Sequence, residues 1–135
     1  MNTYNHPITD LIKQRFSCRR YSNEPISSEQ LQKLQDLMAE LTFGPFGTPM
    51  RFDVVAADGL GGKALRSFGT YGFIHNPNGF VVGALNHSVH NLEEFGYRME
   101  QIVLGATDLG LGTCWLGGTF MKGVFARKIG MQKGE

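Results

Sequence analysis

The longest regular pattern of hydrophobic and polar positions runs from Asn91 to Leu109. Its apolar residues recur every three or four positions and so share one side of a helix; they are Leu92, Phe95, Met99, Ile102, Val103, Ala106 and Leu109. Most of its polar residues, Glu93, Glu94, Arg98, Glu100 and Gln101, fall largely on other sides. Gly110 stands where a glycine commonly ends a helix. The pattern predicts a long core helix.

Besides a short helix over residues 63–68, three further helices are predicted around this one. Residues 1–7 read as a loose arm, and a short helix over residues 8–15 turns Leu11 and Ile12 inward. Ser27 and Gln30 form a capping box that opens the next helix, whose core face is Leu31, Leu34, Leu37, Met38 and Leu41. Thr119 caps a last helix, which carries Met121, Val124, Phe125 and Ile129 and stops at Gly130.

Three short apolar runs predict strands, over residues 51–57, 79–84 and 111–116. The glycines and prolines of residues 42–50 predict a loop, and residues 63–68 a short helix. Because helices and strands alternate only loosely, the fold class is α+β or three-layer α/β/α.

Composition and charge narrow the function. With 135 residues, of which 41% are hydrophobic and 19% charged, the chain predicts one globular domain over residues 1–135. A net charge of +1 gives no electrostatic basis for binding nucleic acid. No apolar run approaches the roughly 20 residues of a membrane span, so no membrane partner is expected. The N-terminus lacks a signal-peptide layout, and Cys18 and Cys114 are isolated. We therefore expect a cytoplasmic protein with reduced thiols.

The strongest chemical signal is the spacing of Arg15, Ser17 and Arg19. On an extended segment, residues two apart point to the same side. Two guanidinium groups and a hydroxyl on one side would bind a phosphate or carboxylate through charge-assisted hydrogen bonds. The alternative is a solvated basic segment after a helix, since Lys13 and Arg20 lie close by.

Other familiar motifs are absent or incomplete. Residues 57–64 lack the first glycine and the final Ser or Thr of a phosphate-binding loop. His87, His90 and Glu93 are better explained as a hydrated helix start than as a metal site. There is no Gly-x-Ser-x-Gly motif and no acid–base constellation. An anion clamp, glycine-rich segments and many aromatics without such a constellation are typical of an enzyme whose cofactor carries the chemistry.

Several motifs resemble the nitroreductase family of flavoproteins, in particular its Putative TM nitroreductase branch. Residues 15–21 resemble the family's opening Arg-x-Ser-x-Arg-x-aromatic motif, and the capped helix follows as expected. Residues 44–52 are similar to a loop that ends in Pro-Trp-x-Phe before a strand. Residues 94–97, 104–112 and 113–118 resemble the central helix, its Leu-Gly-Leu-Gly turn and a glycine-rich strand end. The resemblance covers nearly all of residues 8–135.

The resemblance implies a nitroreductase-like three-layer α/β/α fold with a central mixed sheet and a long core helix. It implies an FMN-dependent enzyme that takes hydride from NADH or NADPH and passes electrons to a small-molecule acceptor such as a nitroaromatic or quinone. It further implies a homodimer with the long helix at its core and FMN between the protomers. Two alternatives stay open, namely a non-catalytic flavin- or nucleotide-binding module and a dimerisation domain.

The resemblance also suggests which residues would bind the cofactor. Arg15, Ser17 and Arg19 would hold the FMN phosphate and ribityl chain, and Gly117 and Gly118 would pass along the isoalloxazine ring. Thr48 and Met50 fall where the family often has Asn or Gln and Trp. The full set of implied cofactor-binding residues is Arg15, Phe16, Ser17, Arg19, Thr48, Met50, Lys63, Tyr71, Leu116, Gly117 and Gly118. Family members continue past a Gly-Glu pair like Gly134-Glu135 into another strand, so we expect the domain to be incomplete at its C-terminus.

Overall fold

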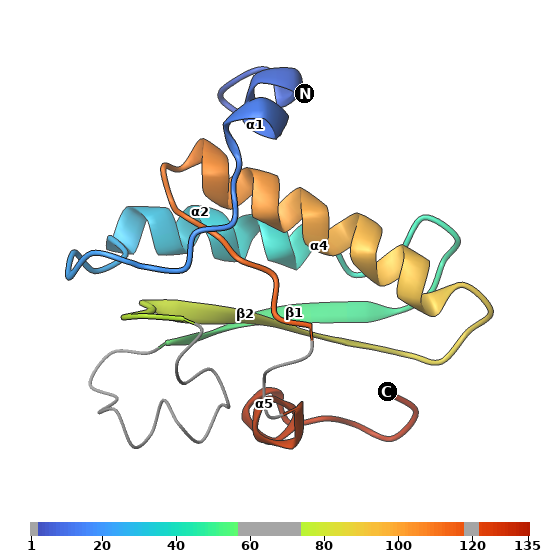
Figure 1. Ribbon diagram of the computed structural model, residues 1–135. Coiled ribbons are helices and arrows are strands. Elements are labelled where there is room, and N and C mark those ends of the chain that lie inside the picture. Colours follow the sequence, from blue (N-terminus) through green and yellow to red (C-terminus); the bar gives the residue numbers. More distant parts are fainter. Residues whose placement is uncertain (1–2, 57–73, 118–121) are drawn as a thin grey trace.

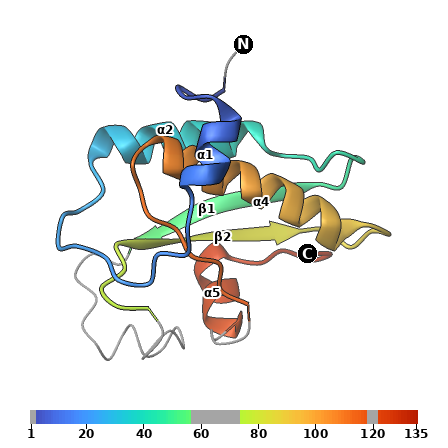
Figure 2. The same cartoon turned by 45° about the horizontal axis from the view of Figure 1, so that its top comes forward.

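The computed structural model describes residues 3–56, 74–117 and 122–135. Two helices, α2 (Ser28–Glu40) and α4 (Asn91–Asp108), lie side by side on one face of a sheet made by β1 (Met50–Ala56) and β2 (Gly79–Leu85). Helix α5 (Lys122–Ile129) covers the other face, and α1 (Ile8–Gln14) packs on the far side of α4 (Figures 1 and 2). The α+β class and the three layers are therefore confirmed.

The sheet of the described residues is narrower than the resemblance implied. It has two antiparallel strands, with Met50 opposite Leu85 and Ala56 opposite Gly79. Outside these two strands, the described residues form two isolated parallel bridges, Ser17 to Thr113 and Arg20 to His75. The prediction of a buried strand over residues 111–116 is wrong. The segment is extended but makes a single bridge to the other described residues, and Trp115 is 44% exposed, so it lacks the two covered faces of a buried strand.

The predicted caps close the start of α2 and the end of α4. The Ser27 hydroxyl accepts from the Gln30 amide nitrogen at 3.1 Å, and the Gln30 side chain accepts from the Ser27 amide at 3.0 Å. Gly110, at φ +81°, and Leu111 donate to Thr107 and Ala106, which is the Schellman pattern. Gln30 also donates to the Leu109 carbonyl at 2.9 Å. The start of α2 is thereby tied to the end of α4.

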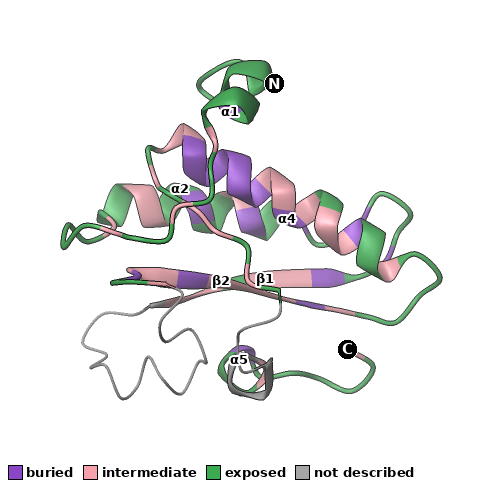
Figure 3. Ribbon diagram, in the orientation of Figure 1, coloured by how far each residue is buried: buried purple, intermediate pink, exposed green. Residues whose placement is uncertain are grey.

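The core lies between α2, α4 and the sheet. Its most buried members are Ile102, Leu34 and Met38, and burial is concentrated in the C-terminal half of α4, as Figure 3 shows. Phe52 of β1 and Phe95 of α4 stack with ring centroids 5.6 Å apart, which joins the helix layer to the sheet. The predicted core helix and its role are confirmed.

Three side chains of the predicted helices face the wrong way. Leu92, expected in the core, is 73% exposed, whereas Glu94, expected on the polar side, is 1% exposed. Residues two apart on a helix point about 200° apart, so turning Glu94 inward turns Leu92 outward. Ile12 is 59% exposed because α1 buries only the side that carries Leu11.

Both described ends of the chain are attached to the body. The Asp108 carboxylate accepts from the amides of Asn5 and His6, at 2.7 and 3.1 Å, and lies 2.6 Å from His6 Nδ1. Residues 3–7 are therefore not the loose arm that the sequence predicted. At the other end, Arg51 forms a two-pronged ion pair with Glu135 and donates to the carbonyls of Ile129 and Gly130.

Two glycines allow a matched test of this packing. A Cβ at Gly83 would clash with the ring of Phe95 and stand 2.8 Å from the ring of Phe52, so Gly83→Ala should lower the free energy of unfolding by about 1–3 kcal/mol. A Cβ at Gly96, within α4, would meet no described atom within 4 Å. Gly96→Ala should raise the free energy of unfolding by up to about 1 kcal/mol, because alanine favours the helix. Urea denaturation measures both, and a shift in the same direction for the two variants would contradict the packing described.

Candidate functional site

The predicted anion clamp lies on an extended segment between two neighbours. Arg15 ends α1 with extended backbone angles, φ −65° and ψ 132°. Downstream, the Cys18 amide donates to the Thr113 carbonyl at 2.8 Å, on one side of the segment. On the other side, the His75 amide donates to the Arg19 carbonyl at 2.8 Å, and Tyr21 donates back to His75. The segment after α1 is therefore held in the extended form that the spacing argument required.

Arg15 has an unused donor in this site. Its Nε donates to the Thr113 hydroxyl at 3.1 Å, but its Nη2 is buried and has no hydrogen-bond partner among the described residues. A buried donor of a charged group left without an acceptor is costly. The side chains of Ser17 and Arg19, from the same segment, are exposed. An anion such as a phosphate would supply the acceptor that Arg15 lacks, so the residues present fit the phosphate end of FMN.

Tyr21 lies at the C-terminal end of the clamp segment and is half-buried. Burial raises the pKa of Tyr21 to about 12, with the nearby thiols of Cys18 and Cys114 adding to the shift and Arg15 and Arg19 opposing it. Its phenol therefore stays neutral throughout the physiological range. Tyr21 acts as a packed wall of the clamp segment rather than as a proton carrier.

Three more of the predicted cofactor-binding residues, Phe16, Leu116 and Gly117, belong to the same two segments as the clamp and Thr113. Phe16 is 67% exposed and Leu116 is half-buried. No described atom lies within 4 Å of the position a Cβ would take at Gly117, so the backbone there is open on that side. Lys63, Tyr71 and Gly118 lie outside the described residues, and their assignment stays a prediction.

Thr48 and Met50 lie elsewhere. Both are 5% exposed, and Thr48 bonds to Glu94 in the first turn of α4. Thr113, the partner of Arg15, follows the opposite end of the same helix, and Figure 1 shows residues 43–49 and 15–19 toward different ends of α4. An 18-residue helix is about 27 Å long. Within one chain, the structure does not bring these two groups together.

Glu94 is the functional-site candidate that the sequence reasoning missed. Its carboxylate accepts from the amides of Phe46 and Thr48, at 2.8 and 3.2 Å, and from the Thr48 hydroxyl, with Ser88 3.5 Å away. Burial acts to raise the pKa of Glu94, but the hydrogen bonds outweigh it and the pKa is lowered. The charged carboxylate thus holds the loop before β1 against α4. No local sequence signal marks it, because its partners Phe46, Thr48 and Ser88 come from segments far from α4 in the sequence or from the loop before it.

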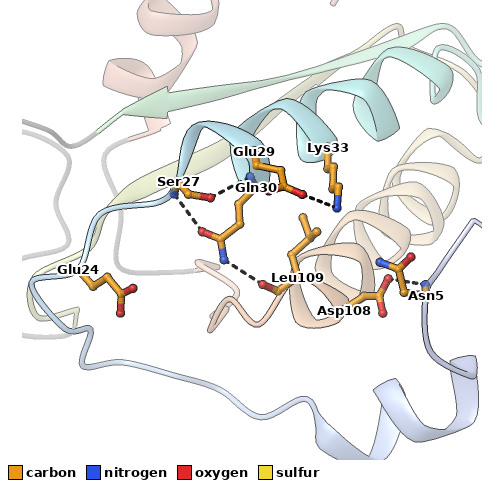
Figure 4. Close-up of a pocket in the computed structure, with 8 residues that line it drawn as sticks. All are labelled: Asn5, Glu24, Ser27, Glu29, Gln30, Lys33, Asp108 and Leu109. Atoms are coloured by element: carbon orange, nitrogen blue, oxygen red, sulfur yellow. Dashed lines mark hydrogen bonds and ion pairs between the residues drawn. The ribbon is translucent and has the colours of Figure 1, made fainter.

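Two hollows lie outside the clamp. One, of about 410 Å³, lies between the start of α2 and the end of α4 (Figure 4). Its polar groups largely bond to each other, since Lys33 pairs with Glu29 at 3.0 Å and Gln30 bonds to Ser27 and Leu109. The second, of about 270 Å³, lies beside Arg51 and Glu135 and includes Met50. Of the predicted site residues, only Met50 lines either hollow, so neither marks the clamp.

The part of the chain that the structure describes has neither a metal-binding cluster nor a membrane-spanning helix. No three His, Cys, Asp or Glu residues come together there as a metal site would require. No helix there has the length and hydrophobicity needed to cross a membrane.

The order of these elements and motifs matches a known family. The model of the family described as Putative TM nitroreductase matches residues 7–133. The chain belongs to this family. It is accordingly an oxidoreductase of the nitroreductase type. No curated protein matches the chain.

Solved structures agree on the fold of this nitroreductase family member. A nitroreductase family protein from Clostridium difficile 630 is 17% identical, with a TM-score of 0.66 over 96% of this chain and 77% of that one. A putative nitroreductase in complex with FMN, from Desulfovibrio desulfuricans, is 22% identical, with a TM-score of 0.68 over 95% and 78%. A nitroreductase family protein from Clostridium novyi NT is 23% identical, with a TM-score of 0.66 over 96% and 80%.

The role of Glu94 in this nitroreductase fold can be tested by Glu94→Gln. The amide would turn an N–H group toward one of the present donors, so we expect the melting temperature to fall by several degrees at pH 7. Because the folded-state pKa of Glu94 is lowered, its stabilisation is present above the unfolded pKa of about 4.3 and is lost as pH falls through the folded value. The gap between wild type and variant should therefore shrink below about pH 4.

The exposed neighbour Glu93 provides the control, since Glu93→Gln should hardly change the melting temperature. A gap for Glu94→Gln that stays the same from neutral to acidic pH would show that the charge of Glu94 does not hold the loop.

Proposed function

We propose that the protein is an FMN-dependent NAD(P)H oxidoreductase that passes electrons to nitroaromatic, quinone or similar acceptors. Family membership supports the reaction type, and the FMN complex of the Desulfovibrio desulfuricans protein supports the cofactor. The observation in this chain that carries the proposal is the buried, unpartnered Nη2 of Arg15 next to Ser17 and Arg19. That arrangement suits a phosphate group with several acceptor oxygens.

Each part of the site has a defined task in this proposal. Arg15, Ser17 and Arg19 bind the phosphate and ribityl end, with Arg15 oriented by its bond to Thr113. The open backbone at Gly117 allows a flat ring to come close, because no side chain stands there. FMN when bound supplies the hydride and electron chemistry, with NADH or NADPH as donor. The protein therefore needs no acid–base pair of its own and contributes binding, orientation and charge.

The clamp is tested by the double variant Arg15→Ala/Arg19→Ala. Each well-formed charge-assisted contact contributes about 1.5–3 kcal/mol. Because every 1.4 kcal/mol is about a factor of ten in affinity, losing two contacts should raise the Kd for FMN by at least about 100-fold. Quenching of flavin fluorescence on titration measures the Kd, and far-UV circular dichroism checks that the variant is folded.

Arg20→Ala is the control: it removes one positive charge, against two in the double variant, from the same segment but outside the i, i+2, i+4 set. Its Kd should stay within a few-fold of wild type. An equal rise in the Kd for FMN in the control and the double variant would show a general effect of positive charge rather than a specific clamp. An unchanged Kd in the double variant would place the phosphate elsewhere.

We further propose that the protein is a homodimer whose FMN sites lie between protomers. One chain holds Thr48 and Met50 at one end of α4 and the clamp toward the other, so a second copy is required to bring both groups to one ligand. Four exposed apolar side chains also lie in the loop before β1 and around the start of α4, and we call them together the α4-start patch. Its members are more than half exposed and are Phe43, Phe46, Val89 and Leu92. Burial of such a patch against a second copy would stabilise the pair.

The dimer is tested by sedimentation velocity at micromolar protein. The wild-type protein should sediment as a species with twice the mass of one 15.0 kDa chain. Leu92→Arg places a charge in the α4-start patch, where the side chain is 73% exposed in one chain, and should shift the protein toward monomer without unfolding it. Met131→Arg changes an exposed apolar residue outside the patch and should leave the dimer intact. A wild-type monomer that binds one FMN per chain would contradict the shared site.

A further inference from the structure

The two cysteines lie on neighbouring segments of the clamp region. Ser17 and Thr113 form a parallel bridge. Cys18 follows Ser17 in one segment, and Cys114 follows Thr113 in the other. Neighbouring strands run about 4.8 Å apart. A disulfide requires Cα atoms about 4.4–6.8 Å apart, so the register of the bridge places the pair within that range.

The side chains alternate in a way that puts both thiols on one face. Arg15 bonds to the Thr113 hydroxyl, so these two side chains share a face with Ser17, two residues on from Arg15. Cys18 and Cys114 then point to the opposite face. Consistent with this, a Cβ at Gly112, two residues before Cys114, would stand 2.9 Å from the Cys18 sulfur. Tyr21 lies within electrostatic reach of both thiols, which independently places them near one group.

Both thiols are free, half-buried and only weakly engaged. Cys18 donates to the carbonyl of Arg20 at 3.3 Å, and Cys114 to the carbonyl of Trp115 at 3.4 Å. Since a thiol is a weak donor, rotation about χ1 frees either sulfur at small cost. Neither bond ties a sulfur to the other segment.

We infer that Cys18 and Cys114 are a thiol pair that closes to an intramolecular disulfide when the protein meets a hydroperoxide. One thiol attacks hydrogen peroxide, the O–O bond breaks, and a sulfenic acid and one water form. The second thiol displaces the sulfenic oxygen as a second water, and the S–S bond forms. The two sulfurs lose two electrons and two protons, and peroxide is reduced to two waters.

The disulfide would join the clamp segment to the segment after α4 on the face opposite Arg15. The bridge from Ser17 to Thr113 and the bond from Arg15 to Thr113 would lie beside the covalent link. The link would therefore hold the anion-binding geometry in place, and it would stabilise the chain because residues far apart in sequence become connected. This inference goes beyond the proposed function and does not depend on FMN binding.

The experiment uses the purified 135-residue chain without FMN, fully reduced and then treated with a small excess of hydrogen peroxide at low micromolar protein. After free thiols are alkylated, the intact mass should be lower than that of the reduced, unalkylated chain by two hydrogen atoms, with no alkyl group added. Digestion without reductant should release one peptide pair that contains Cys18 and Cys114. The oxidised chain should also melt at a higher temperature than the reduced chain.

Cys18→Ser and Cys114→Ser are separate controls, and either one is sufficient if the other folds poorly. Each should gain oxygen or form linked dimers on oxidation, with no loss of two hydrogens within one chain and no rise in melting temperature. The inference is overturned if wild type gains only oxygen, if its disulfides join two chains, or if the oxidised monomer melts lower than the reduced one. Because FMN is absent throughout, these outcomes are independent of whether the clamp binds a flavin phosphate.

Discussion

Burial of the C-terminal half of α4 against α2 and the sheet is the contact on which the remaining structure depends. Ile102 is almost fully enclosed, and the residues around it, Leu34, Met38, Met99 and Ala106, come from both helices. Stacking of Phe52 on Phe95 carries the same contact into β1. Because no other apolar cluster of this size joins the layers in the described residues, the position of α4 sets where every connecting segment must run.

The two ends of α4 organise polar rather than apolar structure. At its start, Glu94 gathers the amides of the loop before β1 around a single buried carboxylate. At its end, Asp108 holds the N-terminal residues, the Leu109 carbonyl receives Gln30, and Gly110 turns the chain toward Thr113. Buried polar groups need partners, and these partners lie on segments distant in sequence. The polar contacts therefore determine how the loops are placed, while the apolar core determines how the layers pack.

This division explains which features could be predicted from the sequence. The periodicity of α2 and α4, the capping box at Ser27 and the terminating Gly110 are local signals, and all three are confirmed. Glu94 was assigned to the polar side because its partners, Phe46, Thr48 and Ser88, cannot be recognised until the loop is folded against the helix. The segment after Gly110 resembled a strand by composition, but a strand needs neighbours, and among the described residues only 17 and 18 provide one. The clamp spacing was visible in sequence, whereas the unpartnered Nη2 of Arg15 depends on tertiary burial.

The contacts of Thr113 explain why the buried Nη2 of Arg15 can remain without a hydrogen-bond partner. Arg15 is fixed on one side by the Thr113 hydroxyl, and the backbone of the same residue accepts from Cys18. Because the Thr113 bond keeps the Arg15 side chain from turning to solvent, its unpartnered donor lowers the stability of the folded state. A ligand that supplies the missing acceptor recovers that cost on binding and meets a side chain that is already ordered. The bridge between Ser17 and Thr113 keeps the segment of Arg15 beside Thr113 and sets Cys18 next to Cys114 in register, so one contact between two short segments serves both the proposed anion site and the proposed thiol pair.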